Sequence, residues 1–215
     1  MILSLHKKDV IAALIIGEAI AWLLTIMLRV NAPELPIPAD LVRTLSGLST
    51  FYALAITLPI LSLVGLALAV AASRIVSILY QAAKFILVGA LNTFVDLGVL
   101  NAFILATGIA SGGGYLLFKT VAFGIAILNS YVWNKYWTFE SSTKKAGNEA
   151  MQFGMVSLGG FLLNVLSAHI VVNVIGPQWG LGEGIWGNIG ALVAVVVSLF
   201  WNFFGYKAWV FNKKR

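Results

Sequence analysis

The sequence predicts an all-α integral membrane protein with six transmembrane helices. The first observation is composition: of 215 residues, 60% are apolar and only 10% are charged. Soluble domains have about 25% charged residues, and so few polar groups could not cover the surface of a soluble fold. The second observation is that the apolar residues form long runs rather than alternating, which argues against a β-barrel. Together they exclude a soluble enzyme, a disordered chain and a nucleic-acid-binding module.

Six apolar runs are long enough to cross a hydrocarbon core about 30 Å thick, which needs roughly 20 helical residues. The first run follows Lys7-Lys8, as in a signal peptide, but it is long and contains Glu18, so we expect it to be retained. The predicted spans are Val10–Val30, Gly47–Ala72, Phe85–Thr107, Tyr115–Trp137, Met151–Ile175 and Ile185–Tyr206.

Two of the connections between these spans carry signals of their own. Prolines at positions 33, 36 and 38 predict an extended extracytoplasmic loop over Asn31–Ser46. Gly112–Gly114 joins two predicted helices and follows no strand, so it predicts a flexible turn rather than a nucleotide-binding loop. Every connection is short, which leaves no room for a separate catalytic domain.

Basic residues are concentrated on one side of the predicted membrane. The opposite side carries Arg29 and Arg43, which are offset by Glu34 and Asp40. The positive-inside bias therefore puts both termini in the cytoplasm, and we expect a multi-pass protein of the cell (inner) membrane. Eleven of the 14 basic residues lie on the cytoplasmic side: Lys7, Lys8, Arg74, Lys84, Lys135, Lys144, Lys145, Lys207, Lys213, Lys214 and Arg215.

The third and fourth spans resemble the fifth and sixth. Phe85–Gly89 aligns with Phe153–Ser157 at an offset of 68 residues, and Lys135–Phe139 aligns with Lys207–Phe211 at an offset of 72. Each unit holds two helices, so both enter the membrane from the cytoplasm and are parallel repeats. The alternative is that two apolar hairpins are alike by composition alone, and the shared Lys-x-Trp-x-Phe ends weigh against it.

The predicted architecture thus has three parts. A two-helix membrane hairpin over residues 1–80 precedes a four-helix core, in which residues 84–139 are the first repeat and residues 151–211 the second. Four core helices would form a thin wall around a polar ligand, so a homo-oligomer is an open expectation.

Polar residues inside the core spans follow a known pattern. Residues 85–96 read FxxVGxxNTxxD, and residues 129–139 read NxxxxNKxWTF. In this the sequence resembles the GtrA-like family of small membrane proteins over about Lys84 to Phe211, with a looser second half. The family typically has four spans, so Met1–Ser73 departs from it.

The resemblance implies translocation of a polyprenyl-phosphate-linked monosaccharide from the cytoplasmic to the outer leaflet, for cell-surface polysaccharide or glycan modification. It also implies a functional link to a polyprenyl-phosphate glycosyltransferase, besides contact with membrane lipids. We expect no catalytic activity, no cofactor and no metal site, because the sequence has no cysteine and no clustered His, Asp or Glu with metal-ligand spacing.

A lipid-linked sugar phosphate needs amides in place of water and cations for its phosphate. Asp96 is the most informative candidate, since an intramembrane carboxylate is a functional hypothesis by default. It could pair with Lys119, hydrogen-bond Asn92 as a protonated acid, or contact the substrate directly. The candidate substrate-binding residues are Lys84, Asn92, Asp96, Lys119, Asn129, Asn134, Lys135, Asn164, Asn202 and Lys207.

Two other ionisable residues lie within spans, Glu18 and His169. We favour a structural hydrogen-bonding role for each, rather than a proton relay. Two alternatives to flipping stay open: a non-transporting membrane partner or anchor of the glycosyltransferase, and a small ion-coupled solute transporter. The second would require the carboxylates of Glu18 and Asp96.

Overall fold

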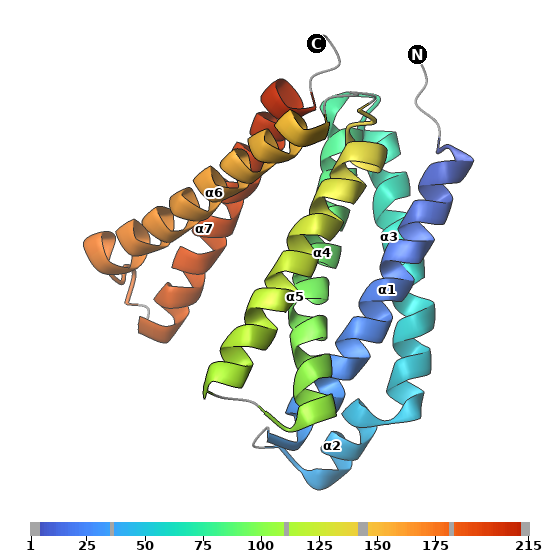
Figure 1. The fold of residues 1–215 in the computed structure, drawn as a ribbon, viewed down its shortest axis with the longest axis vertical. Helices are drawn as coiled ribbons and strands as arrows, with labels where there is room; N and C mark the ends of the chain where they lie inside the picture. The colour runs from blue at the N-terminus through green and yellow to red at the C-terminus, as the bar shows by residue number, and fades with distance from the viewer. Residues whose placement is uncertain (1–4, 35–36, 110–111, 142–145, 181–182, 212–215) are drawn as a thin grey trace. The chain divides into compact units, whose positions relative to one another are not determined.

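The computed structural model describes residues 5–34, 37–109, 112–141, 146–180 and 183–211, and every regular element in them is helical. The predicted all-α class is confirmed (Figure 1). A 3₁₀ turn, η1 (Ala32–Glu34), follows the first helix, and π-helical segments η2 (Asn134–Thr138), η3 (Ile170–Ile175) and η4 (Tyr206–Val210) extend the last three. The α-helices are α1 (Lys7–Asn31), α2 (Ala39–Ser46), α3 (Leu48–Ala72), α4 (Ile78–Thr107), α5 (Gly112–Trp133), α6 (Ala146–His169) and α7 (Glu183–Gly205).

Several helices have the length and hydropathy that crossing a membrane requires, and the chain is a multi-pass membrane protein. The predicted span Tyr115–Trp137 coincides with α5 and most of η2. A sixth crossing there, and hence the six-span topology, stays a prediction. Within the described residues, the five stretches that meet both criteria are Lys7–Asn31, Leu48–Ala72, Ile78–Thr107, Gly147–Ile175 and Leu192–Val210.

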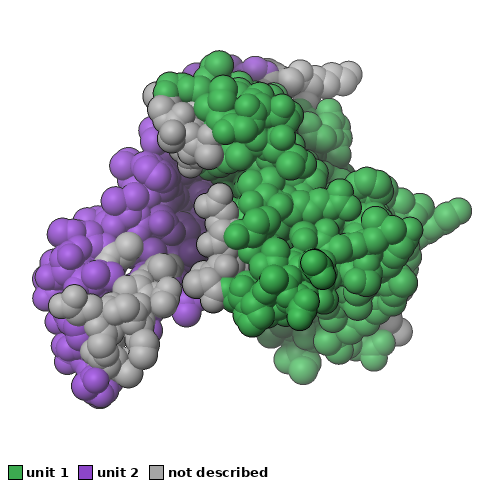
Figure 2. Space-filling model, turned by 90° about the horizontal axis from the view of Figure 1, so that it is seen from below, with its two compact units in different colours: residues 1–138 green, residues 139–215 purple. Residues whose placement is uncertain are grey.

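The chain divides into two compact units, residues 1–138 and residues 139–215 (Figure 2). The first unit contains α1 to α5 with η2, so the N-terminal hairpin and most of the first predicted repeat fold together. The second unit contains α6 and α7 with the π-helical segments that follow them. The three-part division by sequence, at residues 1–80, 84–139 and 151–211, stays a prediction.

In the first unit α1 lies against both α3 and α4, and α5 lies against α4 (Figure 1). The buried side of α1 is made largely of small residues, among them Ala12, Ala13 and Gly17. A Cβ atom added to Gly17 would overlap the backbone of Pro59 in α3. Lipid gives helices no hydrophobic reason to associate, so this close backbone approach is what packs α1 onto its neighbours.

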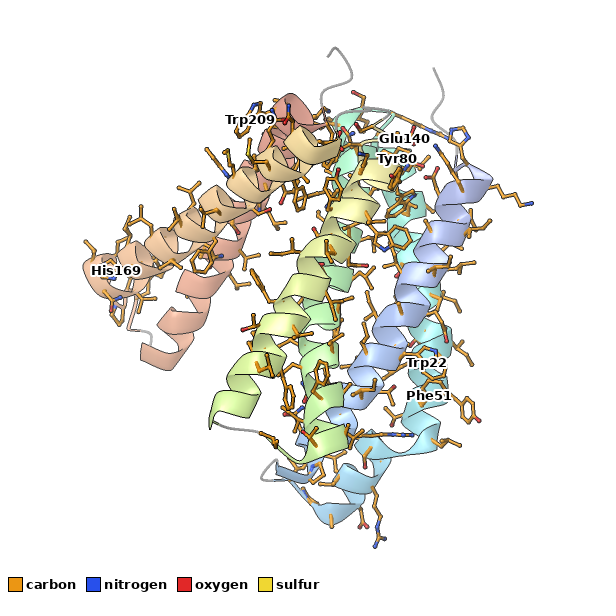
Figure 3. All side chains as sticks on the ribbon, in the orientation of Figure 1. Trp22, Phe51, Tyr80, Glu140, His169 and Trp209 are labelled. Atoms are coloured by element: carbon orange, nitrogen blue, oxygen red, sulfur yellow. The ribbon has the colours of Figure 1, made fainter. Side chains whose placement is uncertain are left out.

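The second unit is a helical hairpin of α6 and α7 with an aromatic cluster where the two helices meet η4. Phe153 of α6 stacks on Tyr206 of η4 with ring centroids 4.5 Å apart, and Phe139 stacks on Phe211 at 5.1 Å. All four rings are buried. Figure 3 places Trp209 and His169 toward opposite ends of this hairpin.

Two loop predictions are wrong. The segment expected to be extended contains the helix α2, which begins directly after Pro38. Asp40 lies in the first turn of α2, where a negative charge stabilises the helix through its dipole. Gly112–Gly114 is the first turn of α5 rather than a flexible turn. The residue that ends α4 in the left-handed conformation is Gly108, with φ of 72°.

The π-helical segments η2 and η4 begin and end 72 residues apart, because Asn134 corresponds to Tyr206 and Thr138 to Val210. This is the offset at which the two Lys-x-Trp-x-Phe ends align. π-Helical turns are rare and are frequent at functional sites, so their equivalent placement supports the internal repeat. The repeat architecture itself stays a prediction.

Candidate functional site

The α4–α5 interface carries an ion pair within the apolar part of both helices. The ammonium nitrogen of Lys119 donates to Oδ2 of Asp96 at 2.5 Å. The pair is not sealed, since 36% of the Lys119 side chain and 22% of the Asp96 side chain are exposed. Oδ1 of Asp96 is buried and has no hydrogen-bond partner among the described residues. Of the three partners that the sequence left open for Asp96, the structure therefore contains Lys119.

A second polar contact lies one helical turn from the ion pair. Nδ2 of Asn129 in α5 donates to Oδ1 of Asn92 in α4 over 3.4 Å. Asn92 and Asp96 are four residues apart and share a face of α4. The α4–α5 pair thus carries an amide contact and an ion pair, from successive turns of α4 and from positions ten residues apart on α5, and we call Asn92, Asp96, Lys119 and Asn129 the polar row.

The two candidates in η2 are buried near the end of the unit that holds the start of α4. Nδ2 of Asn134 donates to the backbone oxygen of Ser130 at 2.9 Å, while Oδ1 of Asn134 has no partner in the described part of the chain. The Lys135 ammonium contacts the hydroxyl of Tyr131 at 3.1 Å and lies 5.4 Å from the centre of its ring. Neither side chain presents its charge or amide on the exterior in this structure.

Lys84 lies in a buried polar cluster that the sequence did not predict. Its ammonium is 2.6 Å from Oδ1 of Asp9, and their side chains are 4% and 0% exposed. The same oxygen accepts the indole N–H of Trp137 at 2.9 Å, and Oδ2 accepts the hydroxyl of Tyr80 at 2.5 Å. The carboxylate comes from α1, whereas its three donors come from α4 and η2.

The sequence analysis did not select Asp9, because Asp9 lies in the first turn of α1, beside Lys7 and Lys8. An acidic residue is common there because it stabilises the N-terminus of the helix. A usable signal was that Lys84 also lies near one end of a predicted span, at the same predicted membrane surface. A second polar contact joins the opposite end of α1 to α4, where Nδ2 of Asn31 donates to Oδ1 of Asn101 at 2.7 Å.

In the second unit the predicted residues are polar groups on the α6–α7 hairpin. Nδ2 of Asn164 contacts the hydroxyl of Ser198 at 3.4 Å. Asn202 lies over Gly160, where a Cβ atom would overlap its amide, and its Oδ1 is buried without a partner in the described residues. Lys207 is exposed, with its ammonium 5.7 Å from the ring centre of Phe203. Lys207 is thus exposed, whereas Lys84 and Lys135, the other two lysines expected at the cytoplasmic ends of core helices, are buried.

Glu18 and His169 both have a partner on their own helix. Oε1 of Glu18 accepts the indole N–H of Trp22 at 2.8 Å, and Nδ1 of His169 lies 3.1 Å from the amide nitrogen of Asn173. Glu18 and Trp22 also line an open, mostly apolar groove of about 600 Å³ between α1 and α3. Figure 3 shows Trp22 beside Phe51, at the opposite end of the unit from Tyr80.

Comparison with known proteins decides the family. Residues 84–211 match the family model described as GtrA/DPMS, transmembrane domain. The chain belongs to the GtrA/DPMS family. The predicted GtrA-like resemblance is thereby confirmed, and the GtrA/DPMS domain contains all ten predicted site residues. Helices α1 to α3 precede it, so Asp9 lies outside the GtrA/DPMS domain, whereas Lys84 and Trp137 lie inside it.

The chain is also similar to a curated bacterial protein. The chain is 31% identical over 129 residues to the uncharacterized membrane protein YngA of Bacillus subtilis (strain 168). The aligned region covers 60% of this chain and 78% of YngA. No solved structure matches the chain.

Proposed function

We propose that this GtrA/DPMS protein moves a polyprenyl-phosphate-linked monosaccharide from the cytoplasmic to the outer leaflet of the cell membrane. The family supports a role connected with polyprenyl-phosphate sugars. Our proposal goes beyond the family in two respects: that the lipid-linked sugar crosses the membrane, and that it crosses from the inner to the outer leaflet. Both termini face the cytoplasm in this account, because that orientation puts most of the basic residues on the inner side.

The observation that carries the proposal is the partly exposed ion pair of Asp96 and Lys119. Asp96 lies twelve residues beyond Lys84, about 18 Å along α4 at 1.5 Å per residue. An ammonium and a carboxylate at that depth are unfavourable against acyl chains, so they are expected to face a polar path or a polar ligand. A sugar phosphate that passes the pair would supply that polar surrounding.

The residues of the polar row have complementary roles in this proposal. The Lys119 ammonium attracts the phosphate as a charge-assisted donor, and Asp96 holds the ammonium when no phosphate is there. The amides of Asn92 and Asn129 both donate and accept, so they can replace water around sugar hydroxyls. The polyprenyl tail stays in the lipid throughout. No covalent bond changes, so the step needs no catalytic group.

The second unit contributes the same chemistry in a reduced form. Asn164 and Asn202 provide amides on α6 and α7, and Lys207 provides an exposed cation in η4, which follows α7. We propose that these groups of the hairpin also bind the headgroup, as do Asn134 and Lys135 of the first unit. A polyprenyl-phosphate glycosyltransferase would supply the lipid, and self-association would complete the wall.

Uptake into sealed vesicles tests the movement. Purified protein is placed in liposomes, and a radiolabelled hexosyl phosphate of geraniol, a short water-dispersible isoprenoid, is added outside. We expect time-dependent, saturable uptake that protein-free liposomes lack. The matched controls are the free hexose phosphate, which lacks a tail, and geranyl hexoside, which lacks the phosphate. Uptake no faster than in protein-free liposomes would contradict movement and favour a non-transporting partner of the glycosyltransferase.

A further inference from the structure

The carboxylate of Asp9 accepts donors on both oxygens and is fully buried. Oδ1 receives the Lys84 ammonium at 2.6 Å and the Trp137 indole N–H at 2.9 Å, while Oδ2 receives the Tyr80 hydroxyl at 2.5 Å. The side chain of Asp9 is 0% exposed. The GtrA/DPMS domain, with Tyr80 just before it, therefore provides a set of donors that encloses one anion.

The donor set suits a phosphate as well as it suits a carboxylate. An ammonium, an indole N–H and a phenol O–H can all donate to one oxyanion, and charge-assisted hydrogen bonds of this type are the strongest in proteins. The rings of Tyr80 and Trp137 flank the ammonium of Lys84, with centres 4.5 Å and 5.4 Å away. Such rings stabilise the cation while they keep water out.

The anion in this site belongs to a helix outside the GtrA/DPMS domain, and it lies where that helix can open locally. Asp9 is in the first turn of α1, and the side chain of the N-cap residue His6 makes no capping hydrogen bond. Asp9 is the first buried residue of α1, and the buried Ala12 and Ala13 follow it one turn later, so only the first turn has to open. Helix ends fray at low free energy compared with packed turns, so Asp9 can leave the site while the rest of α1 stays in place.

We propose that Tyr80, Lys84 and Trp137 form a binding site for the phosphate of an isoprenoid phosphate, and that Asp9 closes this site by occupying the position of the phosphate. The identity of the lipid rests on the proposed function, whereas the competition of two anions rests on the geometry alone. Exchange of one anion for the other leaves the buried ammonium of Lys84 with a counter-charge at each stage, which avoids the large penalty of an unpaired buried ion. Asp9 thereby sets the concentration of isoprenoid phosphate at which the lipid displaces it from the site.

Binding of geranyl phosphate to the full-length protein in detergent tests the competition. Asp9→Asn keeps the size of the side chain but removes its charge, so the phosphate no longer competes with an anion. We expect its Kd for geranyl phosphate to be at least about tenfold lower than that of the wild type. The gain should vanish in the double variant Asp9→Asn/Lys84→Gln. Asp40→Asn, which removes an exposed acid in α2, should bind as the wild type does.

The other arms identify the ligand. Geraniol, which lacks the phosphate, should bind equally to the wild type and Asp9→Asn. Inorganic phosphate should bind to Asp9→Asn little more tightly than to the wild type. If it binds as tightly as geranyl phosphate, the assignment to a lipid is wrong. If folded Asp9→Asn binds geranyl phosphate no better than the wild type, or if the double variant keeps the gain, the whole proposal is wrong.

If Asp9→Asn does not fold, hydrogen exchange of the wild-type protein can test the proposal instead. Saturating geranyl phosphate should speed amide hydrogen exchange in residues 7–10, and it should leave the middle of α1 unchanged. Equal exchange with and without the lipid would overturn the proposal. These assays report binding only, so they separate the two claims. A binding gain without vesicle uptake contradicts flipping, and uptake without the gain contradicts the role of Asp9.

Discussion

The ammonium of Lys119 and the carboxylate of Asp96 are 2.5 Å apart on two apolar helices, and both remain partly open to the exterior. This pair differs from that of Asp9 and Lys84, which is enclosed. An enclosed pair joins helices, whereas a partly exposed pair within a span can also bind a ligand. In the two proposals above, the Asp96–Lys119 pair would contact a passing phosphate, and the Asp9–Lys84 pair would control a closed anion site.

The Asp96–Lys119 pair should appear as a coupling between two substitutions. Asp96→Asn or Lys119→Gln alone leaves one charge without its partner, whereas the double variant removes both charges. We expect the double variant to be more stable than the sum of the single effects by about 1–2 kcal/mol. Denaturant titration of the purified variants in mixed micelles measures this. Strictly additive effects would show that the pair makes no contact in the membrane protein.

The close approach of α1 to α3 should make Gly17 intolerant of even a methyl group. Its added Cβ would overlap the backbone of Pro59, which cannot rotate away as a side chain can. We expect Gly17→Ala to lower the free energy of unfolding by about 1–3 kcal/mol. Gly65→Ala in α3 is the matched control, because nothing lies within 4 Å of its Cβ position. Equal stability of both variants would contradict this packing.

The orientation of the chain is accessible to cysteine labelling, since the sequence has no cysteine of its own. We expect Ser77→Cys, between α3 and α4, to react with an impermeant maleimide only from the cytoplasmic side. Asp40→Cys in α2 should react only from the outer side, because α3 separates the two positions. Both positions are exposed. Labelling of both from one side, or reversed labelling, would contradict the predicted topology.

The role of Glu18 separates flipping from ion-coupled transport. Its carboxylate is hydrogen-bonded to Trp22 in a groove between α1 and α3, outside the GtrA/DPMS domain. We expect Glu18→Gln to keep wild-type uptake of the geranyl-phosphate hexose, because the amide preserves the acceptor. Loss of uptake together with loss of a dependence on pH or sodium would instead favour the ion-coupled alternative.

The helices were predictable from local sequence because an apolar run in a bilayer must satisfy its backbone internally, and a helix does so within one segment. The sequence could also indicate Asp96 and Lys119 as possible partners, because the rise per residue of a helix puts these opposite charges at similar depths in the membrane. Asn92 and Asn129 were candidates from their polarity, but their contact depends on how α4 and α5 are rotated about their axes.

The sequence put Asp9 and Lys84 at the same predicted membrane surface, but it could not show that the two side chains meet. Their contact depends on the register of α1 against α4, where a Cβ atom added to Gly98 of α4 would overlap the side chain of Leu23 of α1. The helix α2 and the start of α5 at Gly112 were mispredicted because proline and glycine were interpreted as loop signals alone. Proline is tolerated at a helix start, and the packing around a glycine decides whether its turn is helical.

The central claim is tested most directly by the initial rate at which the protein takes up geranyl-phosphate hexose into liposomes when the Asp96–Lys119 pair is altered. Loss of one charge-assisted hydrogen bond corresponds to about 1.5–3 kcal/mol, or roughly tenfold or more in rate. We expect Asp96→Asn and Lys119→Ala each to lower the rate at least about tenfold at equal protein content. Thr57→Val, whose hydroxyl bonds only its own helix in α3 within the described residues, should leave it unchanged. Wild-type rates in both folded variants would contradict a path along α4 and α5.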